Sequence, residues 1–430
     1  MKLRESLLEM IQSSTFRNTG WSALGSVSNG VIGAVSSAIL ARFLGVEDFG
    51  TLVLILALLN LVTDLSDLGL NSSLIKFGAA GAGERDQSGF RKIASVVLRL
   101  KLILGGAVVV TALMLGPLLV GLFFDHVDPQ IVWYFQLSLL GALLAVPASF
   151  FPALLQTAQQ FRTYSLAMVS RYGSKLLFLL ICVVMITEWT LDLMVWVEIG
   201  SIVVFLLAGF LLSPLRRFDL SEKDPSLQRQ IFGFGKWIVL YQVISLLGGK
   251  VDIFFIGGIA DSAALGLYGA AMKIAGVVSV TTYSYFSALL PEFSGITSVR
   301  ILSERRRKSF PIVLMFVAAI GVLFLIADPL ILMLFGEPYA GAASLLQVVC
   351  LGLALNVLGH PLSAVLFSQN RPEVFPGSST VSIGVFAAAN LLLIPVLGVM
   401  GAAVAFVLHS VALFIVTLFY YRRWKREITS

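Results

Sequence analysis

Apolar runs of about twenty residues recur from one end of this chain to the other. That is the length an α-helix needs to cross the hydrocarbon core of a membrane. Of the 430 residues, 58% are hydrophobic and only 13% are charged, about half the charged share of a soluble domain. A transmembrane β-barrel would instead show short segments of alternating polarity. The sequence predicts an all-α polytopic membrane protein with about twelve spans, at 20–42, 50–69, 98–123, 131–155, 164–187, 193–213, 233–257, 265–289, 311–334, 343–367, 374–396 and 401–421.

The distribution of Lys and Arg predicts the orientation. If the N-terminus is cytoplasmic, all but three of the 30 bases lie in inside segments or in the inner halves of the spans beside them. The exceptions are Arg42, Lys250 and Lys273, and the outside loops hold acids but no base. The positive-inside rule then places both termini in the cytoplasm, and we expect a bacterial inner membrane. The net charge of +6 reflects topology and contact with anionic lipids, so no nucleic-acid partner is predicted.

Residues 214–232 form the polar stretch that reads as a connector, with six predicted spans on each side. We expect two halves, 1–213 and 233–430, with a short interfacial helix at 1–19. Segments of the two halves match at a nearly constant separation. "GPLLVGLFF" begins at 116 and "DPLILMLFG" at 328, a shift of 212, while "VEDFGTLVL" at 46 and "SAALGLYGA" at 262 differ by 216. Because six is an even number, the halves would be parallel repeats.

One stretch is specific enough to resemble a known family. "ILARFLGVEDFGTLVLILALLNLVTDLSDLGLNSSLIKFG" (39–78) resembles the start of the polysaccharide transporter, or oligosaccharide flippase, family. "KVDIFFIGGIADSAALGLYGAAMKI" (250–274) resembles the turn between that family's seventh and eighth helices. The family belongs to the superfamily of multidrug and toxin extrusion (MATE) proteins and lipid II flippases. The resemblance therefore implies a MATE-like fold of two parallel six-helix halves. The matching positions are Arg42, Leu44-Gly45, Phe49-Gly50, Asp67-Leu68-Gly69-Leu70 and Lys76.

The resemblance also implies a function. We expect a flippase that moves an undecaprenyl-pyrophosphate-linked oligosaccharide from the inner to the outer leaflet by alternating access, for cell-surface polysaccharide biosynthesis. Its expected partners are that lipid-linked oligosaccharide, membrane lipids, and a polysaccharide polymerase or assembly proteins. A cation-coupled drug exporter of the MATE type is one alternative. A membrane enzyme that processes glycans is another, but the short outer loops hold no base. The sequence has no Walker A motif, and we predict no catalytic residue, metal or cofactor.

Five basic residues within the predicted spans are candidates for substrate binding, because a charge inside a bilayer usually faces a cavity or a partner. Lys250 and Lys273 would lie at similar depth and could hold a pyrophosphate as point charges. Alternatively, Lys273 pairs with Asp252 in a structural bridge. The five candidates are Lys250, Lys273, Arg42, Arg171 and Lys175.

Two of these candidates share one helix face, since Arg171 and Lys175 are four residues apart. They either snorkel towards the inner surface or line an inward-facing vestibule. Arg42 either snorkels to the outer interface and pairs with Glu47 or Asp48, or faces the substrate path.

Acidic residues and one histidine within the spans are candidates for coupling to H⁺ or Na⁺ and for gating. Glu198 has no partner that is evident in the sequence, which suits proton coupling; a packing or hydrogen-bonded role is the alternative. Asp64 and Asp67 share a face and either form a gate with Lys76, Arg17 or Arg162 or are solvated at a helix end. His360 lies in a Gly-His-Pro sequence that predicts a kink. The coupling candidates are Glu198, Asp252, Asp64, Asp67 and His360.

Overall fold

The computed structural model describes residues 14–83, 87–121, 129–215, 218–222, 224–233, 243, 248–293, 299–368 and 374–429. Every regular element within these ranges is helical. Most of the interfacial helix predicted at 1–19 lies outside the described residues, and so does most of the seventh predicted span. Residues 14–19 form the start of the long helix α2 (Ser14–Leu65).

Contacts group the chain into two compact units. The first unit is Met1–Ser36 with Ile55–Leu246, and the second is Ser37–Leu54 with Leu247–Ser430. This grouping differs from the predicted halves in three ways. The connector 214–232 belongs to the first unit, and so do residues 233–246, which we expected in the second half. The turn of the first predicted hairpin belongs to the second unit.

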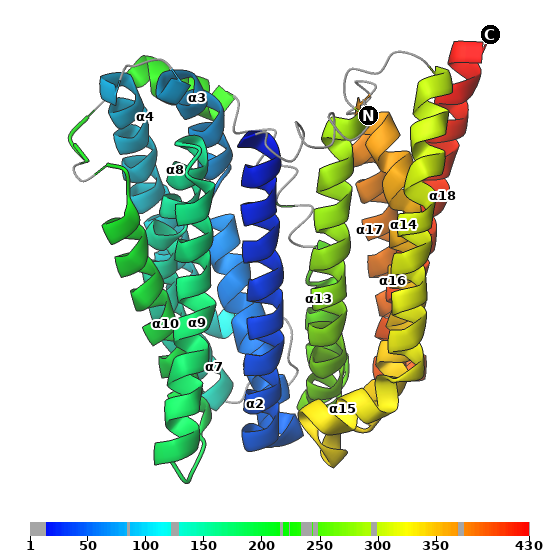
Figure 1. Cartoon of the computed structure of the whole chain (residues 1–430). Helices are drawn as coiled ribbons and strands as arrows, with labels where there is room; N and C mark the ends of the chain where they lie inside the picture. Colours follow the sequence, from blue (N-terminus) through cyan, green and yellow to red (C-terminus); the bar gives the residue numbers. More distant parts are fainter. Residues whose placement is uncertain are drawn as a thin grey trace. The chain divides into compact units, whose positions relative to one another are not determined.

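In the first unit, successive helices lie side by side (Figure 1). The last of them, α10, packs on α7 and α9, while α3 packs on α4 and α8. Its elements after α2 are α3 (Leu70–Gly83), α4 (Gln87–Leu100), the π-helical turn η1 (Lys101–Gly105), α5 (Gly106–Met114), α6 (Gly116–Gly121), α7 (Pro129–Ala148), α8 (Phe150–Thr157), α9 (Phe161–Met185) and α10 (Leu191–Leu212).

The second unit is built around α16, which packs on α13, α14 and α18. The α17 helix packs on α18 and on the short helix α12. The elements of this unit are α12 (Val251–Ile259), α13 (Ser262–Phe293), α14 (Val299–Leu325), α15 (Ala327–Phe335), the 3-10 turn η2 (Glu337–Tyr339), α16 (Gly341–Ser368), α17 (Val374–Leu397) and α18 (Val399–Thr429).

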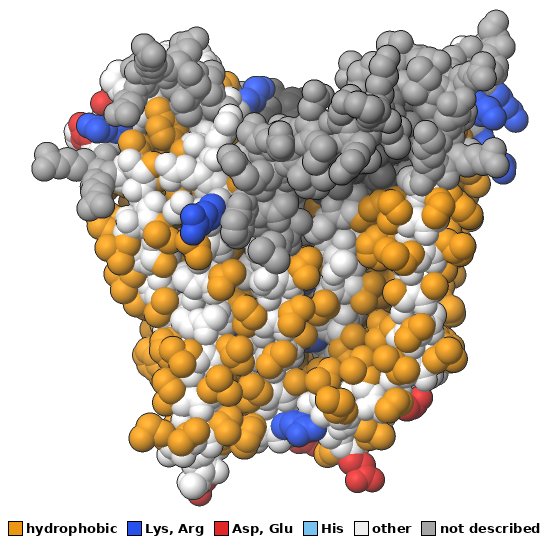
Figure 2. Space-filling view, in the orientation of Figure 1, with side chains coloured by type: hydrophobic (Ala, Val, Ile, Leu, Met, Phe, Trp, Pro, Cys, Tyr) orange, Lys and Arg blue, Asp and Glu red, His pale blue; other side chains and the backbone are white. Residues whose placement is uncertain are grey.

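Most of these helices are long and apolar enough to cross a membrane. Nine described helices qualify, or ten when α14 and α15, which bend by 67° at their junction, count as one span. In addition, α2 is two helices joined at Gly45, whose φ of 78° and ψ of 177° are not helical. Hydrophobic side chains cover the flanks of the helices in each unit (Figure 2). The helical membrane architecture is confirmed, and the count of twelve stays a prediction.

The predicted internal repeat is visible as a reciprocal contact within the second unit. A methyl group on Gly50 would overlap the carbonyl oxygen of Ser262, and one on Gly266 would overlap that of Val46. Val46 and Gly50 become Ser262 and Gly266 on adding 216, so the two helices cross with equivalent residues. Glycine is required here for close backbone approach. The turn itself is made at Gly45, whose φ is positive.

A second sign of the repeat is a pair of matching breaks. The helix pair α5 and α6 is interrupted at Leu115, with φ −90° and ψ 4°. The pair α14 and α15 is interrupted at Ile326, with φ −97° and ψ 11°. These positions are 211 apart, which agrees with the shift read from the sequence. A nearly identical backbone break therefore occurs at equivalent points of the two repeats.

The connector between the predicted halves is docked onto the first unit. Leu215 and Ile231 are buried in a cluster with Phe90, Phe150 and Phe151 of α4 and α8. The Lys92 ammonium lies 3.0 Å from an Asp224 carboxylate oxygen. Asp224 also accepts hydrogen bonds from the Ser226 hydroxyl and backbone N–H and from the Leu227 N–H. The Ser226 hydroxyl bond, the Leu227 N–H bond and the Lys92 contact hold the pKa of this carboxyl well below its usual range.

Candidate functional site

A buried acid between two bases is the main polar feature of α9 and α10. The Lys175 ammonium lies 2.7 Å from one carboxylate oxygen of Glu198, and the Arg171 guanidinium lies 3.3 Å from the other. The Glu198 side chain is only 9% exposed, whereas Arg171 and Lys175 are 23% and 17% exposed. Glu198, for which the sequence offered no partner, thus has two. The bases reach it because four residues of helix put them on one face of α9.

Two aromatic rings hold the Arg171 side chain in place. Its guanidinium carbon lies 5.9 Å from the ring centres of both Tyr172 and Phe205, within the range of cation–π attraction. Ionic partners in a low-dielectric interior attract strongly, and removing one member leaves a costly buried charge. We define these three residues, Arg171, Lys175 and Glu198, as the charged triad. Two cations and one anion give the charged triad a net charge of +1.

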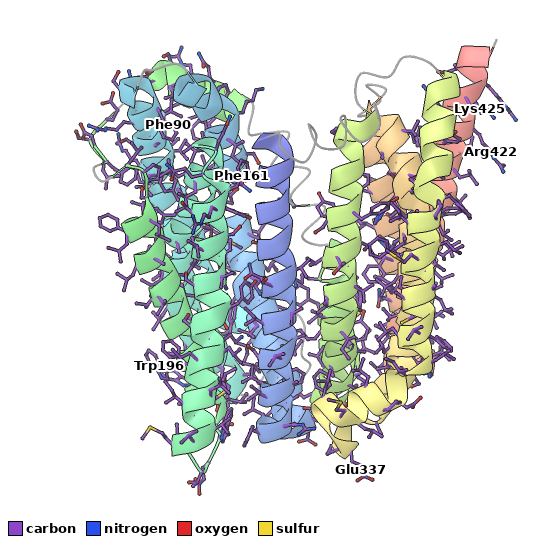
Figure 3. The ribbon with its side chains drawn as sticks, viewed as in Figure 1. Phe90, Phe161, Trp196, Glu337, Arg422 and Lys425 are labelled. Atoms are coloured by element: carbon purple, nitrogen blue, oxygen red, sulfur yellow. The ribbon has the colours of Figure 1, made fainter. Side chains whose placement is uncertain are left out.

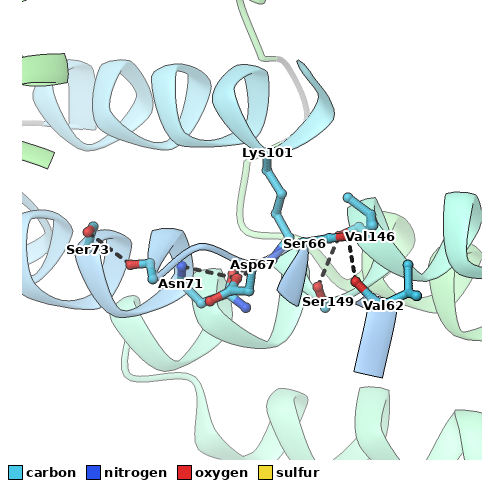
Figure 4. A network of polar contacts seen from close by, with 9 residues as sticks. Val62, Ser66, Asp67, Asn71, Ser73, Lys101, Val146 and Ser149 are labelled. Carbon is cyan, nitrogen blue, oxygen red and sulfur yellow. Dashed lines mark hydrogen bonds and ion pairs between the residues drawn. The ribbon is translucent and has the colours of Figure 1, made fainter. Parts of the chain in front are cut away.

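A second buried ion pair lies where α2 ends and α3 begins (Figure 4). The Lys101 ammonium contacts Asp67 Oδ1 at 2.7 Å and Asn71 Oδ1 at 2.9 Å. The Lys101 side chain is only 1% exposed and that of Asp67 is 13% exposed. We expected Asp67 to pair with Lys76, Arg17 or Arg162, or with water. That expectation is wrong, because Lys101 reaches Asp67 from the neighbouring helix.

This ion pair secures a break in the backbone. Leu68 and Gly69 have φ values of 46° and 71°, and Leu68 is one of only two non-glycine residues with positive φ in the described chain. Such a conformation is unfavourable for a branched apolar side chain. The Leu70 N–H donates to the Asp67 carbonyl oxygen at 2.8 Å, which starts α3. The Asp-Leu-Gly-Leu motif at 67–70 therefore encodes a left-handed turn between two helices, held by Lys101.

Asp64 lies one helical turn before this break. Its charge acts on Lys101 and also on Arg171, so it stands within electrostatic reach of both buried ion pairs. The first unit thus places six charged side chains in one network, three of each sign. The remaining members are Lys175, Glu198 and Asp67. A role for Asp64 in gating stays a prediction.

In the second unit the acid is held by a tyrosine. The buried Tyr268 hydroxyl donates to Asp252 Oδ2 at 2.6 Å, and the Ile253 N–H donates to Oδ1 at 2.9 Å. The alternative in which Asp252 pairs with Lys273 is therefore wrong. Lys273 lies exposed on α13, and Lys250 is half-buried at the start of α12. Their binding of a pyrophosphate stays a prediction.

Arg42 has a structural contact that we did not foresee. Its Nε donates to the carbonyl oxygen of Leu334 at 2.9 Å, and its Nη2 donates to that of Met333. These are two of the last carbonyls of α15, where a cation is favoured by the helix dipole. Arg42 therefore caps α15. The alternative in which it pairs with Glu47 or Asp48 is wrong, and a role facing the substrate path stays a prediction.

The Gly-His-Pro sequence, where we predicted a kink, lies inside α16, and this helix continues through Pro361. The His360 ring lies 5.4 Å from the Phe286 ring, centre to centre, and its Nδ1 is buried without a hydrogen-bond partner. Within the described part of the chain, no three His, Cys, Asp or Glu side chains gather as metal ligands would. A role for His360 in gating stays a prediction.

This architecture is that of a known class of membrane transporters. A multidrug-resistance MATE family transporter of the MOP superfamily, in an inward-facing conformation, matches with a TM-score of 0.74 at 19% identity, covering 95% of this chain and 99% of that one. The lipid II flippase MurJ, in an inward closed conformation, also matches with a TM-score of 0.74, at 12% identity over 93% of this chain and 87% of that one. The predicted MATE-like fold is confirmed.

The sequence comparisons identify the family. Residues 15–297 match the model of the family described as "Polysaccharide biosynthesis protein", so the chain belongs to that family. A relative is the lipopolysaccharide biosynthesis protein WzxC of Escherichia coli (strain K12). It is 24% identical over 416 residues, which cover 93% of this chain and 79% of WzxC. The resemblance read from the sequence is confirmed.

Proposed function

We propose that this protein is a flippase for a lipid-linked oligosaccharide. It would carry an undecaprenyl-pyrophosphate-linked glycan from the inner to the outer leaflet by alternating access, for cell-surface polysaccharide biosynthesis. Membership of the polysaccharide biosynthesis family supports a glycan cargo. The observation that carries the proposal is the charged triad, which keeps two partly exposed cations on one face of a membrane helix.

The chemistry of the cargo explains why cations are needed there. A pyrophosphate carries negative charge into the membrane, where an uncompensated anion is expensive. Arg offers a planar fork for phosphate oxygens, while Lys acts as a point charge without fixed geometry. Arg171 and Lys175 together provide both kinds of contact. Lys250 and Lys273 of the second unit are proposed as further contacts, and Arg42 as a residue that shapes the outer end of its unit.

Net accumulation of the cargo in the outer leaflet needs an energy source, and no nucleotide-binding motif is present in the sequence. We propose coupling to H⁺ or Na⁺ through Asp252, a buried carboxylate that accepts a hydrogen bond from the neutral hydroxyl of Tyr268. A drug exporter of the MATE type shares the fold. It would need acids free to meet a cationic drug, whereas Glu198 already contacts two bases. The protein is accordingly proposed to be a transporter and not an enzyme.

The proposed location is the bacterial inner membrane, with both termini in the cytoplasm. In the second unit, Arg422 and Lys425 lie at one end and Glu337 at the opposite end (Figure 3). In the first unit, Lys92 lies on α4, near the connector, while Asp192 lies at the start of α10. This charge asymmetry supports the proposed orientation. A polysaccharide polymerase or assembly proteins are the proposed partners on the outer side.

The proposal is tested by depleting the protein in cells and analysing the lipid-linked sugars. We expect intermediates to accumulate on the cytoplasmic side and the surface glycan to disappear. Complementation with Lys175→Ala should fail while complementation with Arg423→Ala succeeds, because Arg423 is exposed and pairs with Glu427 on the surface. Intact surface glycan with altered dye efflux would instead favour a drug exporter.

A further inference from the structure

Glu198 occupies a place that an anionic ligand would take. Both of its carboxylate oxygens are engaged, at 2.7 Å by Lys175 and at 3.3 Å by Arg171. The Lys175 distance is the one expected of an ammonium that holds a phosphate oxygen, and the Arg171 contact is longer. Glu198 is also the most buried member of the charged triad, with 9% of its side chain exposed against 23% for Arg171 and 17% for Lys175.

The acid changes what an incoming anion meets. Arg171 and Lys175 alone would present two positive charges, but Glu198 reduces the net charge of the triad to +1. A carrier has to release its cargo as well as bind it, and a site that binds too tightly slows release. Partial neutralisation is therefore a direct way to keep binding loose.

We infer that Glu198 is a built-in competitor of the substrate pyrophosphate for Arg171 and Lys175. It sets the affinity of the site for an anionic lipid low enough for release. This inference rests on the proposed function, because it takes the two bases as the anion site. Glu198 then tunes the affinity for the cargo through its two cationic neighbours.

A different role for Glu198 gives the opposite expectation. If the acid served only as a scaffold that holds Arg171 and Lys175 in position, its removal would let both side chains move and would weaken anion binding. Competition predicts that its removal strengthens binding. The sign of the change therefore separates the two roles.

Four versions of the full chain form a charge series. Relative to the wild type at +1, Glu198→Gln gives +2, Lys175→Gln gives 0, and the double variant with both changes returns to +1. Gln is close in size to both residues and keeps hydrogen-bonding capacity. The probe is a short-chain polyprenyl pyrophosphate, and binding is measured to purified protein in nanodiscs of neutral lipid. The matching polyprenyl alcohol, which lacks the pyrophosphate, is the control ligand.

We expect affinity to follow charge. Glu198→Gln should bind about tenfold more tightly than the wild type, Lys175→Gln about tenfold more weakly, and the double variant within about threefold of the wild type. The alcohol should bind all four equally. If Glu198→Gln does not fold, Lys175→Gln and the double variant give the same comparison, because removing Glu198 should again raise affinity about tenfold.

Two results would overturn the inference, and they differ in what they leave standing. If Lys175→Gln weakens binding but removal of Glu198 weakens it too or leaves it unchanged, the anion site survives and the competitor role fails. If Lys175→Gln binds the pyrophosphate as the wild type does, the anion site itself fails, and the proposed function loses its main support along with the inference.

Discussion

Replacing Lys101 by Met should destabilise the first unit strongly. The change keeps most of the side-chain volume but removes the ammonium that contacts Asp67 and Asn71. Asp67 is left 13% exposed, with one long hydrogen bond of 3.4 Å from the Asn71 N–H. Stranding one member of a buried ion pair costs about 3–5 kcal/mol. Because Asp67 retains that bond and some exposure, we expect a cost near the lower end, about 3 kcal/mol.

The assay is thermal unfolding of the purified protein in detergent, at a fixed scan rate. A loss of about 3 kcal/mol should lower the Tm by roughly 5–10 °C. Adding Asp67→Asn to Lys101→Met removes the stranded charge and should recover most of the loss, as it does when both members of a buried pair are made neutral. Lys92→Met is the matched control: its ion pair is 45% exposed on the lysine side, so no shift is expected. Equal Tm values for Lys101→Met and the wild type, or no recovery in the double variant, would refute a stabilising role for this pair.

Three further predictions follow from local contacts. Gly50→Ala and Gly266→Ala should each lower the yield of folded protein on gel filtration, because the new methyl group meets a backbone carbonyl, while Gly106→Ala, with open space around it, should not. Arg42→Ala should remove the cap of α15 at a cost of about 1 kcal/mol, seen as faster hydrogen exchange at 331–336. Hydrogen bonds from Ser226 and Leu227 and the Lys92 contact hold the pKa of the Asp224 carboxyl below its usual range, so protonation at strongly acid pH should weaken these contacts and hydrogen exchange at 224–231 should rise; equal exchange at all pH values would contradict this.

The sequence predicted the membrane fold well, because hydropathy and the bias of Lys and Arg report directly on the bilayer. It also located the repeat. In the structure, Gly50 and Gly266 occupy equivalent positions where two helix backbones are in close contact. The repeat leaves a readable pattern because similar segments recur at a nearly constant separation. Gly45 also agrees with the prediction, since its positive φ breaks α2 at the predicted turn.

The ion pairs could not be predicted in the same way. Lys101 and Asp67 are 34 residues apart, and Lys175 and Glu198 are 23 apart. Which charges meet depends on how helices pack, and the hydrophobic pattern leaves each helix free to rotate about its axis. Lys101 lies two residues after Arg99, at the inner end of a predicted span. Its position therefore predicts a base at the inner surface and not a buried ion pair. One clue was available: Lys101 and Asp67 both lie near the inner ends of adjacent antiparallel spans.

The burial of the connector could not be predicted from its composition either. Its polar composition indicated an exposed linker, yet Leu215 and Ile231 are buried against α4 and α8. Apolar residues spaced through a polar stretch were the available signal. The connector therefore belongs to the first unit.

The central claim is tested most directly by measuring flipping in proteoliposomes. A fluorescent polyprenyl-pyrophosphate-linked oligosaccharide is placed in both leaflets, and an impermeant quencher reports the fraction that becomes accessible from outside over time. We expect rapid exchange between leaflets with the wild-type protein, exchange at least tenfold slower with the Arg171→Ala and Lys175→Ala double variant, and wild-type exchange with Arg423→Ala. Exchange at the wild-type rate in the double variant would contradict the account, and so would wild-type protein that leaves the lipid-linked sugar in its original leaflet.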